Sequence, residues 1–337
     1  MTEVLRVAGV GAGYFSQFHY NSWQRIDRVK LTGVCDTDLV KAEAIAPDRA
    51  FAVVSDLLAA TEIDLVDIIT PPGARLAVVE AVAAAGLPMI VQKPLADDLM
   101  GAQEIARVAR RAGVAMLVHE NFRFQPWYRE ARRLLDSGLL GQPQGIQFRL
   151  RPGDGRGPDA YLARQPYFQQ MPWFLIHETA VHFIDTFRYL MGEVGSVMAD
   201  LRRLNPVIAG EDAGIVLFRF RDGASGIFDG NRLAETEARN PRLTMGEMLL
   251  DCAEASLRLD GDGGLHLKPH GQPERPHDFE WSDRDFGGDC VHAFQQHAVA
   301  HFLDGAKAET SVDKYLRNVR IVEAIYESAA EGEWVQI

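Results

Sequence analysis

Cysteine is scarce in this sequence, which has only Cys35, Cys252 and Cys290 among its 337 residues. Their number is odd and none lies in C-x-x-C spacing, which argues against a disulfide framework and against a cysteine-ligated metal site. The chain also lacks a basic-then-apolar leader and any apolar run long enough to cross a bilayer. We therefore expect a cytoplasmic protein with no membrane partner.

Positive charge is scarce as well, because 35 Lys and Arg residues face 47 Asp and Glu residues and leave a formal charge of −12. This balance argues against general nucleic-acid binding and against docking on anionic membranes. Apolar residues make up 47% of the chain and charged residues 24%, as in ordinary globular proteins. The length predicts about two domains.

A glycine-rich turn near the start of the chain is the most informative stretch. An apolar run over residues 4–10 ends in Gly11-Ala12-Gly13, and a helical pattern follows, with Ser16 in the place of a third glycine. Gly11 permits the tight turn, and Gly13 lets a pyrophosphate approach the backbone at the helix N-terminus. We expect Tyr14 and Phe15, in the same turn, to contact the bound dinucleotide as well. An ordinary strand-to-helix turn is the alternative interpretation.

The next predicted strand, over residues 29–35, ends in Asp36. An acid about 20 residues beyond the glycines can accept hydrogen bonds from the hydroxyl groups of an adenosine ribose. The same carboxylate would repel a 2′-phosphate, so the pattern favours NAD over NADP as the cofactor. The alternative is that Asp36 is an exposed turn residue.

Strand and helix patterns alternate six times over the first 120 residues, which predicts a doubly wound parallel sheet of the Rossmann type. The carboxyl ends of such strands form one rim, where ligands bind. Residues 11–16, 36, 70–72, 92–94 and 119–123 fall on this rim. The further cofactor contacts expected there are Thr70, Pro71, Gln92, Lys93 and Asn121.

The pattern changes beyond residue 120. Helical patterns near residues 126–137 and 176–191 frame longer strand candidates between residues 144 and 259. This predicts an α/β NAD-binding domain over residues 1–120, then an α+β domain over 121–337 with a large, mostly antiparallel open sheet. We expect the second of these domains to bind substrate and to form oligomers. In the predicted strand over residues 215–220, the first half has apolar residues on both faces. We therefore expect a homodimer or homotetramer through this sheet. A strand covered within one chain is the alternative.

Two places in the chain could carry acid–base chemistry. Lys93 ends a predicted buried strand on the rim, although most lysines are simply exposed. Further on, Glu178 and His182 share one stripe of a predicted helix, where the histidine could move a proton and the acid could orient it. A solvated helix face is the alternative. His177 and His182 are five residues apart, which excludes an H-E-x-x-H metal site, and we expect no metal.

Taken together, these motifs resemble the Gfo/Idh/MocA family of NAD(P)-dependent oxidoreductases. The shared features are the glycine turn with His19, Asp36, Thr70-Pro71, Gln92-Lys93-Pro94, Arg123 with Pro126, the stripe Glu178, His182 and Asp185, and residues 321–329. The resemblance implies sugar or polyol substrates, Lys93 as the catalytic lysine, and Glu178 with His182 as the catalytic acid–histidine pair. This chain departs from the family pattern at Gln92 (usually Glu), Arg75 (commonly His) and Glu178 (usually Asp).

Residues 156–167 together with His177-Glu178 are similar to a subgroup associated with dehydrogenation of D-apiose or similar pentoses. The resemblance therefore implies an NAD-dependent sugar dehydrogenase, with oxidation of an aldose at C1 to a lactone as the favoured reaction. The expected substrate contacts are Lys93, Arg123, Arg156, Tyr161, Arg164, Trp173, Glu178 and His182. Two alternatives remain: an enzyme that cleaves glycosides while retaining NAD, and a non-catalytic dinucleotide-binding regulator. The presence of Lys93 and His182 favours an enzyme.

Overall fold

The protein is described by a computed structural model that covers residues 3–337. Its contacts divide the chain into two compact units. Unit 1 comprises Met1–Asn121 and Val291–Val319, and unit 2 comprises Phe122–Cys290 and Arg320–Ile337. The first boundary lies within a residue of the expected one. Residues 291–319, which the sequence pattern grouped with the second domain, have most of their contacts in unit 1.

Unit 1 contains a six-stranded parallel sheet in the order β3-β2-β1-β4-β5-β6, as predicted. Its strands are β1 (Leu5–Val10), β2 (Val29–Cys35), β3 (Ala50–Phe51), β4 (Leu65–Ile68), β5 (Met89–Gln92) and β6 (Met116–His119). Strands β4, β5 and β6 are buried along their whole length. This is why they read in the sequence as short, largely apolar runs rather than as alternating patterns.

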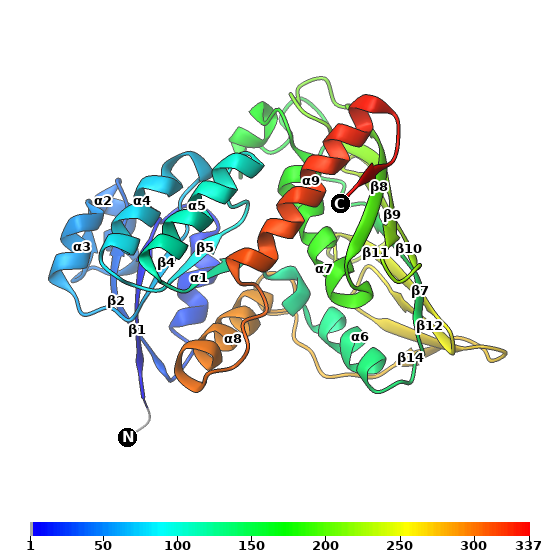
Figure 1. Ribbon diagram of the computed structural model, residues 1–337, viewed down its shortest axis with the longest axis horizontal. Helices are drawn as coiled ribbons and strands as arrows, with labels where there is room; N and C mark the ends of the chain where they lie inside the picture. Colours follow the sequence, from blue (N-terminus) through cyan, green and yellow to red (C-terminus); the bar gives the residue numbers. More distant parts are fainter. Residues whose placement is uncertain (1–2) are drawn as a thin grey trace. The chain divides into compact units, whose positions relative to one another are not determined.

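Helices lie against both faces of this sheet (Figure 1). They are α1 (Ser16–Trp23), α2 (Leu39–Ile45), α3 (Val54–Ala60), α4 (Pro72–Ala84), α5 (Leu99–Ala112), α8 (Cys290–Asp304) and the first part of α9 (Val312–Glu331). The start of α5 has a local cause, because the Asp98 carboxylate accepts a hydrogen bond from the Gly101 amide at 2.7 Å. Tyr20 of α1 and Ala42 of α2 pack on Val34, which fixes both helices on the sheet.

Unit 2 contains a nine-stranded sheet in the order β14-β13-β12-β11-β7-β10-β9-β8-β15, in which only the β7–β10 pair is parallel. Its strands are β7 (Pro143–Leu150), β8 (Val194–Arg202), β9 (Ala213–Phe220), β10 (Ser225–Asn231), β11 (Gly246–Cys252), β12 (Ala255–Leu259), β13 (Leu265–Pro269), β14 (Arg275–His277) and β15 (Val335–Gln336). The last three lie at or next to the sheet edges, and the sequence pattern missed them. The expected mostly antiparallel open sheet is confirmed.

One face of this sheet is covered by helices, and Figure 1 shows α6 (Pro126–Asp136) and α7 (Val181–Met191) lying along it. The shorter helical segments of unit 2 are η1 (Phe122–Phe124), η2 (Pro166–Gln170) and the π-helical segment η3 (Leu175–Ala180). Val216 and Phe218 of β9 point to the helix side and are buried. Ile215, Ile227 and Leu249 lie on the other face and are 37–39% exposed.

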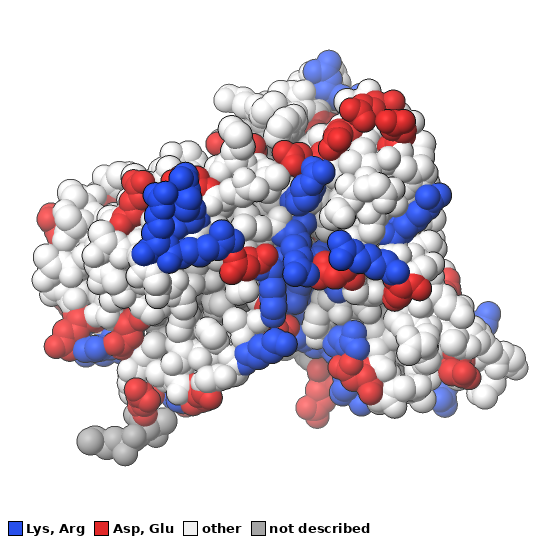
Figure 2. Space-filling model, viewed as in Figure 1, with Lys and Arg blue, Asp and Glu red and all other residues white. Residues whose placement is uncertain are grey.

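Charged side chains of both signs are interspersed over the face of the molecule in Figure 2. Basic side chains gather over α5, whose last turn contains Arg110 and Arg111. Arg110 donates a hydrogen bond to Asp313 at 3.0 Å, so part of this cluster is paired within unit 1. No helix among residues 3–337 is long and apolar enough to span a membrane.

Candidate active site

The glycine turn between β1 and α1 is shaped by its neighbours in unit 1. Gly11 has a φ of +110°, and a Cβ atom there would lie 2.9 Å from the carbonyl carbon of Ile69, so only glycine fits without strain. A Cβ atom on Gly13 would meet no atom of residues 3–337 within 4 Å. The backbone at Gly13 therefore borders open space, where a ligand can approach it closely.

Asp36, at the end of β2, is tied directly to this turn. Its carboxylate accepts hydrogen bonds from the amide of Ala12 at 2.6 Å and from the amide of Asp38 at 2.9 Å. The acid therefore lies beside the glycine turn, where the sequence pattern placed a ribose-binding carboxylate. Because both bonds come from backbone amides, the position of the carboxylate is fixed by the main chain.

The other predicted rim residues of unit 1 occupy strand ends. Thr70 follows β4, and its Oγ1 atom is buried with no hydrogen-bond partner within the part of the chain that the structure describes. Pro71 immediately precedes α4, and Asn121 ends the unit with 2% of its surface exposed. Tyr14 is 41% exposed in the glycine turn, while Phe15 packs on Phe18 at a ring-centroid distance of 5.2 Å. An open glycine turn with a fixed carboxylate and an unsatisfied hydroxyl fits a dinucleotide.

Lys93 comes directly after β5, and its backbone amide donates a hydrogen bond to Oε1 of Gln92 at 2.7 Å. The adjoining turn is held by Arg75, which is 1% exposed and donates to the carbonyl oxygens of Pro94 and Thr70. Burial lowers the pKa of the Arg75 guanidinium to about 10. Arg75 thus joins the turn after β4 to the turn after β5, a role that its position in the sequence did not indicate.

The segment with Glu178 and His182 differs from the single helix that was expected over residues 176–191. Residues Leu175–Ala180 form a π-helical turn, and the α-helix α7 begins at Val181. The hypothesis of a solvated helix face is wrong, because His182 is 4% exposed and Asp185 2% exposed. The His182 ring stacks on Phe122 with centroids 3.8 Å apart and planes within 5°. Single π-helical turns within helices are frequent at functional sites.

A buried carboxylate, Glu211, holds the start of the π-helical turn. Its oxygens accept hydrogen bonds from the amides of Phe174 at 3.2 Å and Ile176 at 3.0 Å, and from the Tyr326 hydroxyl at 2.6 Å. These amides have no partner inside a helix, so an anion at this end stabilises them. Tyr326 also accepts a hydrogen bond from the amide of His177 and stacks on Trp173 at 5.0 Å. Sequence analysis missed Glu211 and Tyr326, because no local motif marks them.

The other end of this segment is held by Arg232, which is 2% exposed. Its guanidinium donates to both carboxylate oxygens of Asp154, at 3.1 and 2.8 Å, and to Oγ1 of Thr179 at 2.6 Å. Thr179 in turn donates to the Glu178 carboxylate at 2.6 Å. Burial alone would lower the pKa of Arg232, but Asp154, Tyr161 and Glu178 together outweigh it and raise that pKa. Arg232, which follows strand β10, is thus connected with Glu178 through the Thr179 hydroxyl and through an ion pair of 3.7 Å.

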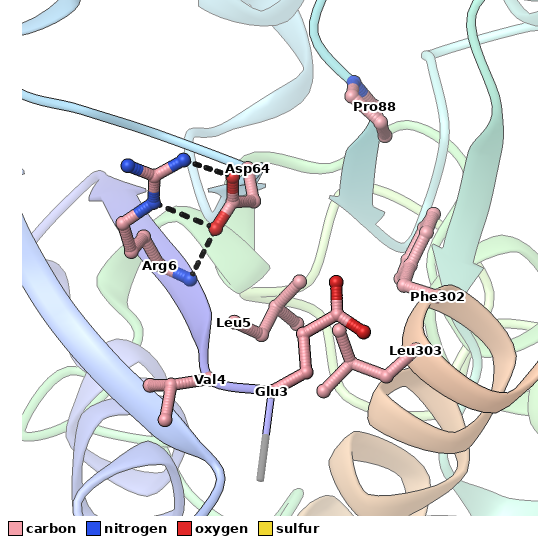
Figure 3. Close-up of a pocket in the computed structure, with 8 residues that line it drawn as sticks. All are labelled: Glu3, Val4, Leu5, Arg6, Asp64, Pro88, Phe302 and Leu303. Atoms are coloured by element: carbon pink, nitrogen blue, oxygen red, sulfur yellow. Dashed lines mark hydrogen bonds and ion pairs between the residues drawn. The ribbon is translucent and has the colours of Figure 1, made fainter. Parts of the chain in front are cut away.

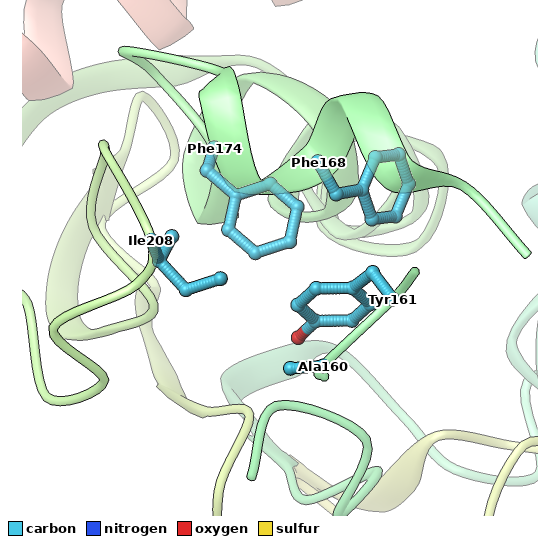
Figure 4. Packing of buried hydrophobic residues seen from close by; sticks show 5 residues of the cluster. All are labelled: Ala160, Tyr161, Phe168, Phe174 and Ile208. Carbon is cyan, nitrogen blue, oxygen red and sulfur yellow. The ribbon is translucent and has the colours of Figure 1, made fainter. Parts of the chain in front are cut away.

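Aromatic rings surround the same guanidinium. Tyr161, Phe168 and Phe174 form a buried cluster with Ala160 and Ile208 (Figure 4). The guanidinium carbon of Arg232 lies 4.8 Å from the ring centre of Phe174 and 5.1 Å from that of Tyr161. Cations held over aromatic faces in this way are stabilised, and more so when they are buried.

The predicted substrate contacts of unit 2 have partners within the protein. Tyr161 donates to Asp154 at 3.3 Å, and Arg164 donates to the same carboxylate at 3.1 Å. Arg123 forms a two-bond ion pair with Asp185 at 2.6 and 2.8 Å. Arg156 donates to the carbonyl oxygen of Leu233 at 2.5 Å. Trp173 is 45% exposed. Their role toward a substrate stays a prediction.

One cavity of unit 1 lies away from the rim. It has a volume of about 330 Å³ and lies at the amino ends of β1, β4 and β5 (Figure 3). Arg6 borders it and donates from its backbone amide and its Nε atom to Asp64, each at 2.8 Å. The glycine turn and Lys93 lie at the carboxyl ends of the strands, so this cavity does not belong to the cofactor site. Residues 3–337 contain no cluster of three or more His, Cys, Asp or Glu side chains suited to a metal ion, and the absence of a metal stays a prediction.

Comparison with known families decides the identity of the fold. Residues 5–120 match the Gfo/Idh/MocA oxidoreductase family with an NAD-binding Rossmann fold, and residues 128–258 match the Gfo/Idh/MocA C-terminal domain. The chain belongs to the Gfo/Idh/MocA family. Unit 1 therefore contains an NAD-binding Rossmann domain, and the protein is an oxidoreductase, as the sequence motifs predicted.

Two curated relatives within the Gfo/Idh/MocA family match over the full length of the chain. D-apiose dehydrogenase of Paraburkholderia graminis is 31% identical over 352 residues, covering 100% of this chain and 91% of the relative. D-apiose dehydrogenase of Rhizobium rhizogenes is 30% identical over 347 residues, covering 100% and 98%. A solved oxidoreductase from Agrobacterium radiobacter, in complex with NAD+, L-tartaric acid and magnesium, has a TM-score of 0.88 at 29% identity, with 98% of both chains covered.

Proposed function

We propose that this protein is an NAD-dependent sugar dehydrogenase that oxidises a CH–OH group, with an aldopentose such as D-apiose as the favoured substrate. The observation that carries the proposal is the full-length similarity to two D-apiose dehydrogenases, combined with Lys93 at the end of β5. The fixed carboxylate of Asp36 beside the glycine turn supports NAD over NADP, since it would repel a 2′-phosphate.

In the proposed reaction, the glycine turn and Asp36 would hold NAD, which would supply the hydride acceptor for the substrate carbon. His182 accepts the proton of the substrate hydroxyl, and its ring is kept in one orientation by stacking on Phe122. Lys93 donates a hydrogen bond to the same oxygen and stabilises the negative charge that develops there. The opposite assignment, with Lys93 taking the proton, fits the same residues. Loss of hydride and proton converts the alcohol to a carbonyl, which is a lactone when the substrate is an aldose oxidised at C1.

Glu178 completes the proposed catalytic set, either by orienting His182 or by binding a second substrate hydroxyl. Its carboxylate accepts the hydrogen bond from Thr179 at 2.6 Å, so its position depends on Arg232 behind that hydroxyl. Trp173 and Arg156 are the most exposed of the proposed substrate contacts. We assign them to sugar recognition together with Arg123, Tyr161 and Arg164.

We further propose that a second copy of the chain covers the open face of the unit 2 sheet, giving a homodimer or homotetramer. Ile215, Ile227 and Leu249 leave apolar surface half-exposed on that face. Light scattering on the purified protein gives the subunit number, and a monomer at working concentration would contradict this assembly. We also keep the cytoplasm as the proposed location, supported by three cysteines that form no disulfide.

The decisive experiment measures NADH formation by the purified protein with a panel of aldopentoses, aldohexoses, inositols and sugar acids. We expect turnover with at least one pentose. Lys93→Met should reduce kcat by about 10³-fold while NAD still binds, because the lysine stabilises charge that exists only in the transition state. Lys30→Met is the matched control, since Lys30 is exposed at the amino end of β2, opposite the rim.

The alternatives give different results in the same assay. A glycoside-cleaving enzyme that retains NAD would form no net NADH but would release sugar from a glycoside. A dinucleotide-binding regulator would bind NAD and turn over nothing. Either outcome would contradict the proposed dehydrogenase. Equal turnover by the unaltered protein and by Lys93→Met would contradict only the role assigned to Lys93.

A further inference from the structure

A hydrogen-bonded series of buried polar side chains leads to the backbone of Lys93 in unit 1. The proposed reaction gives this series no role. Asp67 of β4 and His19 of α1 are both 0% exposed, and Gln92 at the end of β5 is 7% exposed. Nδ1 of His19 lies 2.8 Å from the Asp67 carboxylate, and Nε2 of His19 lies 3.1 Å from the amide nitrogen of Gln92. The hydrogen-bonded series ends at the Lys93 backbone amide, which donates to Gln92.

The Lys93 backbone amide fixes the direction of every hydrogen bond in this series. A backbone N–H can only donate, so the atom of Gln92 that faces Lys93 must be its carbonyl oxygen. The NH₂ group of Gln92 then faces His19 and donates to Nε2, which must present a lone pair. The remaining proton of a neutral His19 ring is on Nδ1, from which it is donated to Asp67. One protonation arrangement alone satisfies all three contacts.

The surroundings of His19 prevent its ring from turning away. The ring lies against His119 with centroids 4.0 Å apart, and against the edge of Phe15 at 5.7 Å. Trp23, one turn further along α1, donates from its indole nitrogen to the same Asp67 oxygen at 2.8 Å. Helix α1 is thus fastened to β4 and β5 by side chains that water cannot reach, where hydrogen bonds are costly to break.

We propose that His19, held as the neutral Nδ1–H tautomer by Asp67, is a positioning residue that fixes Gln92 and, through it, the backbone of Lys93. The proposal rests on the proposed function, because it assigns His19 to the lysine that acts on the substrate oxygen. His19 itself touches neither substrate nor cofactor in this scheme. A shift of about 1 Å in a catalytic group can cost about 10²-fold in rate. Loss of the residue that holds Lys93 in place should therefore lower kcat.

Two substitutions of His19 separate positioning from packing. In His19→Gln, the longer amide reaches the place of Nε2, where its oxygen can accept from Gln92. In His19→Asn, the shorter amide stays near the place of Nδ1, where it can donate to Asp67 but ends short of Gln92. Both variants lose the ring and its contacts with His119 and Phe15. They therefore differ in which link survives: His19→Gln keeps the link to Gln92, and His19→Asn keeps the link to Asp67.

We expect His19→Asn to lower kcat about 10- to 100-fold with the Kd for NAD unchanged, and His19→Gln to stay within about threefold of the unaltered protein. Gln92→Met, which removes both hydrogen bonds at similar side-chain volume, should lower kcat to a similar extent as His19→Asn. Equal losses in the two His19 variants would mean that the ring matters only for packing and would overturn the proposal. Unchanged kcat in all three variants would overturn it as well. Thermal melts establish that each variant is folded at the assay temperature.

A second readout does not depend on turnover. Nitrogen-15 NMR of histidine-labelled protein, with the His19 signals identified by their loss in His19→Gln, reports which ring nitrogen carries the proton. We expect a protonated Nδ1 and an unprotonated Nε2 at neutral pH. A cationic ring or the opposite tautomer would overturn the proposal even if no sugar is turned over. Failure of the sugar panel with the expected tautomer present would instead contradict the proposed function and leave the hydrogen-bond direction established.

Discussion

Two buried arginines show how differently the two units hold their candidate site residues. Arg75 of unit 1 and Arg232 of unit 2 are 1% and 2% exposed. Arg75 donates to two neutral carbonyl oxygens, and burial lowers its pKa to about 10. Arg232 faces the carboxylate of Asp154. Burial would lower the pKa of Arg232, but Asp154 together with Tyr161 and Glu178 outweighs burial and raises it.

The partners of these arginines explain the contrast. Arg75 bonds to the main chain at strand ends, 5 and 19 residues away in the sequence. Arg232 bonds to side chains 53 and 78 residues away. The rim of unit 1 is therefore built largely from backbone geometry that the parallel sheet supplies. The Glu178 segment of unit 2 depends on particular side-chain pairs brought together by the fold.

The largest expected effect comes from removing each arginine in turn. Arg232→Met should lower the free energy of unfolding by about 3–5 kcal/mol, because it leaves the Asp154 charge buried without its main partner. Arg75→Met should cost about 1–3 kcal/mol, because it leaves only carbonyl groups unsatisfied. Chemical denaturation of both variants measures the difference. Equal losses would show that the charge of Asp154 does not set the two regions apart.

A smaller effect separates the two glycines of the cofactor turn within unit 1. Gly11→Ala should destabilise the fold by about 1–3 kcal/mol, because φ is +110° and the new Cβ would meet the backbone of Ile69. Gly13→Ala should change the free energy of unfolding by less than about 0.5 kcal/mol, because its Cβ would have no neighbour within 4 Å in the described part of the chain.

NAD binding supplies the second half of this test. Titration of protein fluorescence with NAD should show at least about tenfold weaker binding by Gly13→Ala, a loss of about 1.4 kcal/mol. The reason is that the added methyl group occupies the space beside the turn that the cofactor needs. An unchanged Kd for Gly13→Ala would place the pyrophosphate elsewhere on the rim.

The smallest expected effect is a pH dependence confined to unit 2. Burial would raise the pKa of Asp154, but Arg232 and Arg164 outweigh it, and this pKa lies below its ordinary value. The stability gained from the ionised carboxylate is therefore complete above about pH 4, the value for an unfolded chain, and is lost as the pH falls toward the folded-state pKa. Melting temperatures between pH 7 and 3 should fall less steeply for Asp154→Asn than for the unaltered protein. Arg75→Met should keep the original slope, because Arg75 donates its hydrogen bonds to carbonyl oxygens, which do not titrate. Parallel curves for all three proteins would contradict this account.

Much of unit 1 could be predicted because its signals are local. The apolar runs of β1, β4 and β5, the turn at Gly11 and the acid Asp36 all lie in short stretches whose spacing alone indicates a dinucleotide-binding sheet. Prediction was weaker around Glu178. Residues 176–191 have a helical period throughout, and nothing in that period marks where the π-helical turn ends and α7 begins.

The sequence by itself determined the parallel sheet, the order of the rim residues along it and the family, because each follows from patterns within a few dozen residues. The tertiary structure alone decided which side chains hold the candidate site residues. Glu211 meets Tyr326 across 115 residues, Arg232 meets Asp154 across 78, and His19 meets Gln92 across 73. Pairs so distant leave no local period or motif. They exist because folding removes these polar groups from water, where each needs a partner and finds it on another element of the fold.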